Sequence, residues 1–367
     1  MEQRLKVIIS GGGTGGHIFP AIAIANAIRK INPAADILFI GAMGRMEMEK
    51  VPKAGYRIEG LPIAGLQRSL SLQNLLLPFK VINSLMKASS AIRSFKPNAV
   101  VGVGGYASGP VLFAAALMGI PTLIQEQNSF AGITNKILGK RAKRICVAYE
   151  GMEQFFPKAK ITITGNPVRK DILNLEGKRA EGLKYFDLND KRKTILVIGG
   201  SLGARTINES MQSKLSELAN EEVQVLWQTG NRYFEVNATA ARGFEEKIKV
   251  KEFIDRMDLA YAVADVVISR AGALSIAELC ICKKPSVLVP SPNVAEDHQT
   301  KNALALVTKD AALMIKDEEA KEKLIATTLN LLKDASLQQK LSTNIAQLAK
   351  PNADDDIAKL VIGLSSE

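Results

Sequence analysis

Short apolar runs alternate with longer stretches of helical periodicity along the whole chain. Residues 5–9 form a β-branched run that ends in a glycine cluster, and an apolar, alanine-rich helix pattern follows over residues 18–31. The same order of strand, glycine loop and helix returns from residue 194. Further strands are expected at residues 37–40, 99–103, 122–124, 161–164, 224–227, 248–251, 266–268 and 286–289. Continuously apolar strands that alternate with helices predict parallel sheets covered on both faces.

The repeated pattern predicts an α/β protein with two doubly wound, Rossmann-like domains. A chain of 367 residues also exceeds the roughly 250–300 residues that one hydrophobic core serves. The turn residues at 165–167 place the boundary there, which gives domains at 1–165 and 166–349. The polar segment 174–193 is expected to be a surface excursion. A last short helix is expected at about 350–367, and its return to the first domain is an arrangement that the sequence leaves open.

Sheets of this kind bind ligands outside the carboxyl ends of their strands, so two facing domains would bring the glycine loops to one cleft.

Composition excludes several classes of protein. Apolar residues make up 47% of the chain and aromatic residues 5%, which argues against disorder and against a nucleic-acid binder that works by stacking. The longest relevant apolar stretch, 111–120, is about half of a membrane span. No signal peptide is recognisable, and three cysteines fit a reduced cytoplasm.

All of the net charge of +11 lies in the first half of the chain. Residues 1–165 hold 20 Lys and Arg against 8 Asp and Glu, whereas the remaining residues hold 28 against 29. This asymmetry indicates an anionic partner for the first domain, although a merely solvated basic surface remains an alternative. We expect docking on an anionic membrane surface, with core packing of the leucines as the alternative. The residues concerned are an apolar cluster, Leu70, Leu72, Leu75, Leu76, Leu77 and Phe79, near Arg68 and Lys80, and a basic run, Lys136, Lys140, Arg141, Lys143 and Arg144.

The first glycine cluster satisfies the spacing of the dinucleotide fingerprint with Gly11, Gly13 and Gly16. The next strand, however, ends without the carboxylate that would hold the adenosine ribose. Five glycines in six positions instead leave backbone N–H groups bare at a helix start, which suits phosphate. His17 follows directly, and the positive helix end should keep its imidazole neutral, as a general base requires; a capping role is the alternative. His298 is expected in a loop.

A second small-residue turn precedes a helix at residues 269–278, after the strand at 266–268. Glu278 falls about one turn into this helix. Its carboxylate could accept hydrogen bonds from a ribose diol, or it could simply complement the helix dipole. No zinc site is expected, because the two histidines are far apart and no cysteine or carboxylate cluster has ligand spacing.

Seven motifs in this order and spacing resemble the MurG family of GT-B-fold glycosyltransferases. They lie at residues 13–20, 104–110, 126–128, 165–169, 199–201, 253–255 and 269–273. The resemblance implies an inverting transfer of N-acetylglucosamine from UDP-N-acetylglucosamine to the 4-hydroxyl of the muramyl sugar of lipid I. The product would be lipid II for peptidoglycan synthesis, made by a peripheral enzyme at the cytoplasmic face of the bacterial cell membrane.

The resemblance also assigns roles residue by residue. His17 would be catalytic, Thr14, Gly15, Gly16 and Asn128 would contact the donor, and Arg169 and Ser201 would hold the pyrophosphate. Ile254 would offer its backbone to uracil, Gln299 would contact the sugar, and Ala273, Leu274, Ser275, Ile276, Ala277 and Glu278 would line the nucleotide, with Glu278 on the ribose. Gln125 stands where some members have histidine and Leu202 where many have glutamine, so these two positions receive no polar role.

No cofactor or obligatory metal is expected, because the Asp-x-Asp pattern occurs only within 354–356, in a tail expected to be solvated. Two other classes stay open. One is another GT-B enzyme that acts on UDP-sugars, such as a soluble glycosyltransferase or a UDP-N-acetylglucosamine 2-epimerase. The other is a non-enzymatic nucleotide-binding module, which would leave His17 without a task. An epimerase would need more carboxylates and histidines in its cleft than this chain offers.

Overall fold

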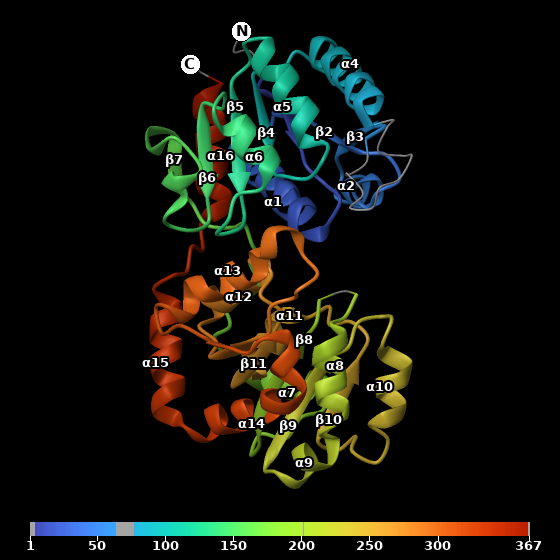
Figure 1. Cartoon of the computed structure of the whole chain (residues 1–367), viewed down its shortest axis with the longest axis vertical. Coiled ribbons are helices and arrows are strands. Elements are labelled where there is room, and N and C mark those ends of the chain that lie inside the picture. Colours follow the sequence, from blue (N-terminus) through green and yellow to red (C-terminus); the bar gives the residue numbers. More distant parts are fainter. Residues whose placement is uncertain (1–3, 64–76, 201, 366–367) are drawn as a thin grey trace. The chain divides into compact units, whose positions relative to one another are not determined.

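The structure is a computed structural model that describes residues 4–63, 77–200 and 202–365 (Figure 1). The chain divides into two compact units. The first unit comprises residues 1–168 and 351–367, and the second comprises residues 169–350. The division falls at Val168, shortly after the turn at residues 165–167. Each unit is a parallel sheet with helices on its faces, as the alternation of strands and helices predicts.

The first unit contains a seven-stranded parallel sheet. Its strands, in spatial order, are β3 (Arg57–Leu61), β2 (Asp36–Ala42), β1 (Lys6–Ser10), β4 (Ala99–Gly102), β5 (Thr122–Glu126), β6 (Arg144–Val147) and β7 (Ile161–Ile163). Helices α1 (Gly15–Ile31), α2 (Glu47–Lys53) and α16 (Ala353–Leu364) contribute to the core on one face. Helices α4 (Leu77–Phe95), α5 (Ser108–Leu117) and α6 (Ile133–Gly139) contribute to the core on the other.

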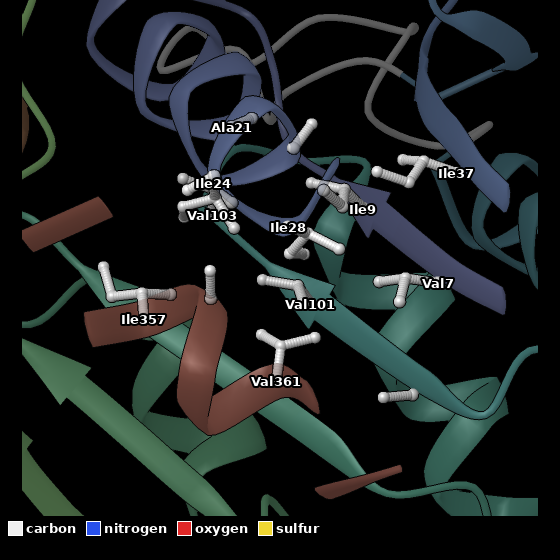
Figure 2. Close-up of a cluster of buried hydrophobic side chains, with 14 of the residues drawn as sticks. Val7, Ile9, Ala21, Ile24, Ile28, Ile37, Val101, Val103, Ile357 and Val361 are labelled. Atoms are coloured by element: carbon white, nitrogen blue, oxygen red, sulfur yellow. The ribbon is translucent and has the colours of Figure 1, made fainter. Parts of the chain in front are cut away.

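The alternation of side chains along β1 divides this unit into two cores. Val7 and Ile9 point to the face of α1 and α16, whereas Ile8 points to the face of α4, α5 and α6. In Figure 2, Ile357 and Val361 of α16 lie among side chains of α1 and β4, and both are completely buried. The C-terminal helix therefore completes the hydrophobic core of the first unit.

The second unit contains a six-stranded parallel sheet. Its strands, in spatial order, are β10 (Ile248–Lys251), β9 (Val223–Gln228), β8 (Lys193–Ile198), β11 (Val266–Ser269), β12 (Ser286–Leu288) and β13 (Leu313–Met314). Its helices are α7 (Lys178–Phe186), α8 (Arg205–Gln212), α9 (Leu215–Asn220), α10 (Phe234–Ala240), α11 (Met257–Val263), α12 (Ala273–Cys282), α13 (His298–Val307), α14 (Ala320–Lys333) and α15 (Ala335–Ala346). Short 3₁₀ turns lie at Lys170–Ile172, Ala295–Asp297 and Asp317–Glu319 in this unit, and at Met152–Gln154 and Lys158–Lys160 in the first unit. Apolar residues of β8, β9 and β11 pack with α8 and α14 in one core.

Several expectations about local structure are wrong. The segment 174–193 is more than a surface excursion, because it contains α7, which packs against α11. Gly182 makes this packing possible, since a Cβ atom there would lie 2.6 Å from Cγ1 of Val263. His298 is the first residue of α13 and does not lie in a loop. Asp354, expected in a solvated tail, is 6% exposed.

The basic run is not one continuous helix face. Helix α6 ends at Gly139, and Arg144 is already the first residue of β6. Within the apolar cluster, residues 70–76 lie outside the described residues, as does Arg68 before them, and the side chains of Leu77 and Phe79 are not described. Throughout residues 4–63, 77–200 and 202–365, no helix combines the length and the apolar character that crossing a membrane requires.

Candidate functional site

His17 lies in the first turn of α1, directly after the glycine loop that follows β1. Its Nδ1 atom is 3.1 Å from the carbonyl oxygen of Gly12 and 3.2 Å from Oγ1 of Thr14. The Thr14 hydroxyl can donate or accept, but a carbonyl oxygen can only accept, so the contact with Gly12 assigns the proton of the neutral ring to Nδ1. In this tautomer Nε2 carries no proton and is the nitrogen that can take one up.

Two glycines after β4 leave room around this histidine. A Cβ atom added at Gly104 would lie 2.9 Å from Nε2 of His17, and the φ of Gly104 is +89°. A side chain there would be strained and would also crowd the bare nitrogen. A Cβ atom at Gly105 would overlap the carbonyl oxygen of Gly12. The two loops therefore pack backbone against backbone, and His17 is half-buried between them.

The backbone N–H groups of the first glycine loop are not all bare, which corrects one expectation. The N–H of Gly13 donates to Oε2 of Glu47 at 3.0 Å. A carboxylate thus occupies the place that a phosphate oxygen would take at Gly13. The glycine loop ends and α1 begins at Thr14, Gly15 and Gly16. Thr14 and Gly16 are exposed, and Gly15 is half-buried. Glu47 was missed from the sequence, where it resembles an ordinary acidic residue at a helix start.

Asn128 lies in the loop between β5 and α6, and a buried carboxylate holds that loop. Glu126 accepts hydrogen bonds at Oε1 from the backbone N–H of Asn128 at 3.1 Å and at Oε2 from Nδ2 of Asn135 at 2.8 Å. Burial raises the pKa of Glu126. Nε2 of the neighbouring Gln125 donates to Oδ1 of Asn166 at 2.9 Å, so Gln125 has a polar partner although no polar role could be assigned to it from the sequence.

The second unit contains a pocket of about 660 Å³ at the carboxyl ends of β8 and β11. Of the predicted donor residues, Ser275 and Gln299 line this pocket, and Oε1 of Gln299 accepts from the backbone N–H of Ser291 at 2.9 Å. Ser201 lies outside the described residues. The remaining lining residues are Gly199, Gly200, Gly203, Ala204, Arg205, Thr206, Glu209, Tyr233, Arg270, Gly272, Ser291, Asn293 and Asp317.

Two arginines and two carboxylates give the pocket its charge. Arg270 pairs with Asp317 and also donates through Nη1 to the carbonyl oxygens of Val289 and Pro290, both at 3.1 Å. Arg205 donates through Nε to Oε1 of Glu209 at 2.7 Å. Arg270 lies within the sequence motif at residues 269–273, but neither arginine was assigned a role from the sequence. Asp317 carried no sequence signal at all, because it lies far along the chain from Arg270.

Arg169 and Glu278 form an ion pair, and neither residue is among those that line this pocket. Nε of Arg169 is 2.9 Å from Oε1 of Glu278, and the hydroxyl of Tyr261 donates to Oε2 at 3.0 Å. The Glu278 side chain is 12% exposed, and this burial raises its pKa, while Arg169 and Tyr261 favour its charged form. Burial also raises the pKa of Tyr261. Tyr261 was missed because it lies within an apolar run that reads as core.

The other predicted donor residues have mixed settings. The backbone N–H of Ile254 donates to Oε1 of Gln228 at 2.9 Å, so only its carbonyl remains for a ligand. Residues 273–277 form the start of α12, after Gly272 in an extended conformation. Leu202 is 57% exposed. Across the described part of the chain, no group of three or more His, Cys, Asp or Glu side chains is arranged to hold a metal ion.

Family models match most of the chain. The N-terminal domain model of glycosyltransferase family 28 matches residues 7–147, and the C-terminal domain model matches residues 194–360. A protein of Cytophaga hutchinsonii is 57% identical over 98% of this chain and 97% of its own length. A protein of Flavobacterium psychrophilum is 53% identical over 99% and 98%. Both are named as UDP-N-acetylglucosamine–N-acetylmuramyl-(pentapeptide) pyrophosphoryl-undecaprenol N-acetylglucosamine transferases.

A solved structure agrees with these relatives. The crystal structure of MurG from Acinetobacter baumannii superposes with a TM-score of 0.79 at 30% sequence identity, and the match covers 98% of this chain and 99% of that one. The fold expected from the sequence motifs is thereby confirmed. This chain belongs to glycosyltransferase family 28 and, within it, to the MurG family.

Proposed function

We propose that this chain transfers N-acetylglucosamine from UDP-N-acetylglucosamine to the 4-hydroxyl of the muramyl sugar of lipid I, forming lipid II. Relatives with this activity in their names are 53–57% identical over nearly the full chain. The structural observation that carries the proposal is the orientation of His17, whose Nδ1–H is committed to the Gly12 carbonyl so that Nε2 is a proton acceptor.

His17 would act as the general base of an inverting displacement. Nε2 takes the proton from the acceptor hydroxyl while the hydroxyl oxygen forms a bond to C1 of N-acetylglucosamine. The bond between C1 and the pyrophosphate oxygen breaks, and UDP leaves with the electron pair. Attack from the opposite side of the ring converts the α-linked donor into a β-linked product. Within the first unit, Thr14, Gly15, Gly16 and Asn128 border this reaction.

The second unit would bind the donor. Arg169, already beside the Glu278 carboxylate, is proposed to share its charge with the pyrophosphate, together with Ser201. Glu278 would accept from the ribose hydroxyls, with its carboxylate fixed by Tyr261. The carbonyl of Ile254 would contact uracil, Gln299 the sugar, and residues 273–277 the nucleotide. Arg205 and Arg270 line the pocket, each paired with a carboxylate, and would stabilise the negative charge that develops on UDP by donating hydrogen bonds to it.

The first unit would also dock on the anionic cytoplasmic surface of the bacterial inner membrane, where the lipid-linked acceptor lies. Helix α6 exposes Ile133 and Ile137 by 64% and 60%, one turn apart, and the exposed Lys140 and Lys143 follow directly. Helix α4 likewise exposes Ile82 and Met86, again one turn apart. Apolar side chains beside lysines suit shallow insertion combined with attraction to acidic headgroups.

The test is a transfer assay with radiolabelled UDP-N-acetylglucosamine and a lipid I analogue. The expected product is a lipid-linked β-1,4 disaccharide, which extracts into butanol, with stoichiometric release of UDP. UDP-glucose serves as the matched donor control and should be used poorly. Conversion of the donor to its 2-epimer without an acceptor would indicate the epimerase alternative. Binding of UDP without any turnover would indicate a nucleotide-binding module.

A further inference from the structure

A buried carboxylate lies directly beneath the glycine loop of the first unit. Glu47 is the first residue of α2 and is 1% exposed. Its Oε2 accepts from the N–H of Gly13 and its Oε1 accepts from the N–H of Ala42, at the end of β2, both at 3.0 Å. A Cβ atom at Gly12 would overlap this carboxylate, and one at Gly41 would lie 2.6 Å from Cγ of Glu47. The absence of side chains at Gly12 and Gly41 therefore leaves the space that the Glu47 side chain occupies.

The hydrogen bonds of Glu47 and His17 meet in one peptide group. The N–H of Gly13 and the carbonyl of Gly12 belong to the same planar amide, in which the two bonds point in opposite directions. Glu47 accepts from the N–H on one side of this amide, and Nδ1–H of His17 donates to the carbonyl on the other. A continuous series of hydrogen bonds thus connects the Glu47 carboxylate, the Gly12–Gly13 peptide and the His17 imidazole.

These linked hydrogen bonds affect which nitrogen of the imidazole carries the proton. A carboxylate that accepts from an amide N–H polarises the amide, so its carbonyl oxygen becomes a stronger acceptor. The stronger acceptor holds the proton on Nδ1, so Nε2 stays unprotonated. It also stabilises the positive charge that appears when Nε2 takes up a proton. A carboxylate bonded directly to the histidine does the same in Ser-His-Asp enzymes.

We propose that Glu47 is a positioning residue that sets the tautomer and orientation of His17 through the Gly12–Gly13 peptide. Glu47 contacts no substrate in this scheme. The proposal rests on the proposed function in one respect, the role of His17 as the base. The tautomer of the ring is nevertheless a property of the protein alone, and it can be measured without any turnover.

The tautomer can be read by NMR, because the chain contains only two histidines, His17 and His298. Protein labelled with ¹⁵N-histidine is examined at alkaline pH, where both rings are neutral, and His298→Gln assigns the signals. In the wild-type protein, His17 should show a protonated Nδ1 and a bare Nε2. Glu47→Gln removes the charge and turns an NH₂ group toward one of the two N–H donors. The His17 ring should then shift toward the Nε2–H tautomer, while the signals of His298 stay in place.

Kinetics provide the second measurement. Glu47→Gln should lower kcat by about tenfold or more, which is part of the 100- to 10,000-fold that a general base supplies, and leave the donor KM within about twofold. Glu49→Gln is the matched control, because Glu49 lies in the same helix but is exposed and pairs with Lys50 and Lys53. This variant should keep the wild-type tautomer and kcat.

The proposal is overturned if wild-type His17 carries its proton on Nε2, an outcome that needs no variant and stands even if Glu47→Gln fails to fold. It is also overturned if Glu47→Gln leaves the tautomer unchanged, or if Glu47→Gln leaves kcat unchanged while His17→Ala abolishes turnover. The role of His17 as base is tested separately by turnover of His17→Ala. Failure of that role would leave the tautomer result intact, so the two failures are distinguishable.

Discussion

Arg169 and Glu278 form an ion pair in the second unit, with Nε of the arginine 2.9 Å from Oε1 of the glutamate, although 109 positions separate them in the sequence. Each residue is proposed to contact a different part of the donor, the pyrophosphate and the ribose. Their pairing orients both side chains before the donor binds. This reduces the ordering that binding would otherwise require.

Glu278→Ala should weaken binding of UDP-N-acetylglucosamine, because two ribose hydroxyls lose a charged acceptor. Hydrogen bonds to charged groups contribute about 1.5–3 kcal/mol, which corresponds to roughly 10- to 100-fold in Kd. Calorimetric titration with the donor and with its 2′-deoxy analogue measures the effect. If wild type and variant discriminate equally against the deoxy analogue, Glu278 does not contact the ribose.

Tyr261→Phe should weaken donor binding by less, about two- to tenfold, because the ring packing remains and only the hydroxyl that fixes Glu278 is lost. Tyr185→Phe is the control, since Tyr185 is 56% exposed in the same unit. Calorimetry on the two variants decides the matter. Equal affinities would mean that the Tyr261 hydroxyl does not support the donor site.

Donor binding should also depend on pH through Glu278. The carboxylate accepts from the ribose only while it is ionised, and burial raises its pKa above the ordinary value. As the pH falls, affinity should therefore decline before it reaches the roughly pH 4.3 at which an exposed glutamate titrates. UDP-N-acetylglucosamine is the appropriate ligand, because its phosphates do not titrate in this range. In Glu278→Gln the decline should be absent; the same decline in that variant would assign it to another group.

Vesicle binding tests the docking surface of the first unit. Lys140→Glu combined with Lys143→Glu should weaken co-sedimentation with phosphatidylglycerol vesicles about 20-fold or more, since each basic residue contributes about 1 kcal/mol near an anionic surface. The control, Lys184→Glu with Lys321→Glu, makes the same change in net charge at exposed positions of the second unit. Equal loss in both double variants would point to net charge alone, and undiminished binding would exclude this surface.

The sequence predicted most strands of both sheets, including the edge strands β7 and β10, but not β3, β6 and β13. Central strands are apolar on both faces, so their pattern is strong. β3 alternates exposed and half-buried residues at a sheet edge, and β13 has only two residues. β6 begins within the basic run, where Arg144 obscures the apolar residues that follow it. These three segments become strands because they hydrogen-bond to a neighbouring strand. The pattern of apolar residues within one segment does not reveal such a partner.

The candidate site likewise contains residues that could be identified from the sequence and residues that could not. His17 could be identified because it adjoins a glycine loop, a signal that is local in sequence. Glu47 acts on that loop from more than thirty positions away, and Tyr261 reaches Glu278 from the helix preceding β11. In the sequence, one resembles a helix-start carboxylate and the other a core aromatic. Their roles depend on which side chains the fold brings together.

His17 is proposed to be the general base, and the decisive test is the turnover of His17→Ala measured together with its affinity for the donor. Both quantities are taken on one preparation, by the lipid I transfer assay and by calorimetric titration with UDP-N-acetylglucosamine. If His17 is the base, kcat should fall by about 100- to 10,000-fold while the donor Kd stays within about twofold of wild type. A variant that keeps kcat within a fewfold of wild type would contradict it.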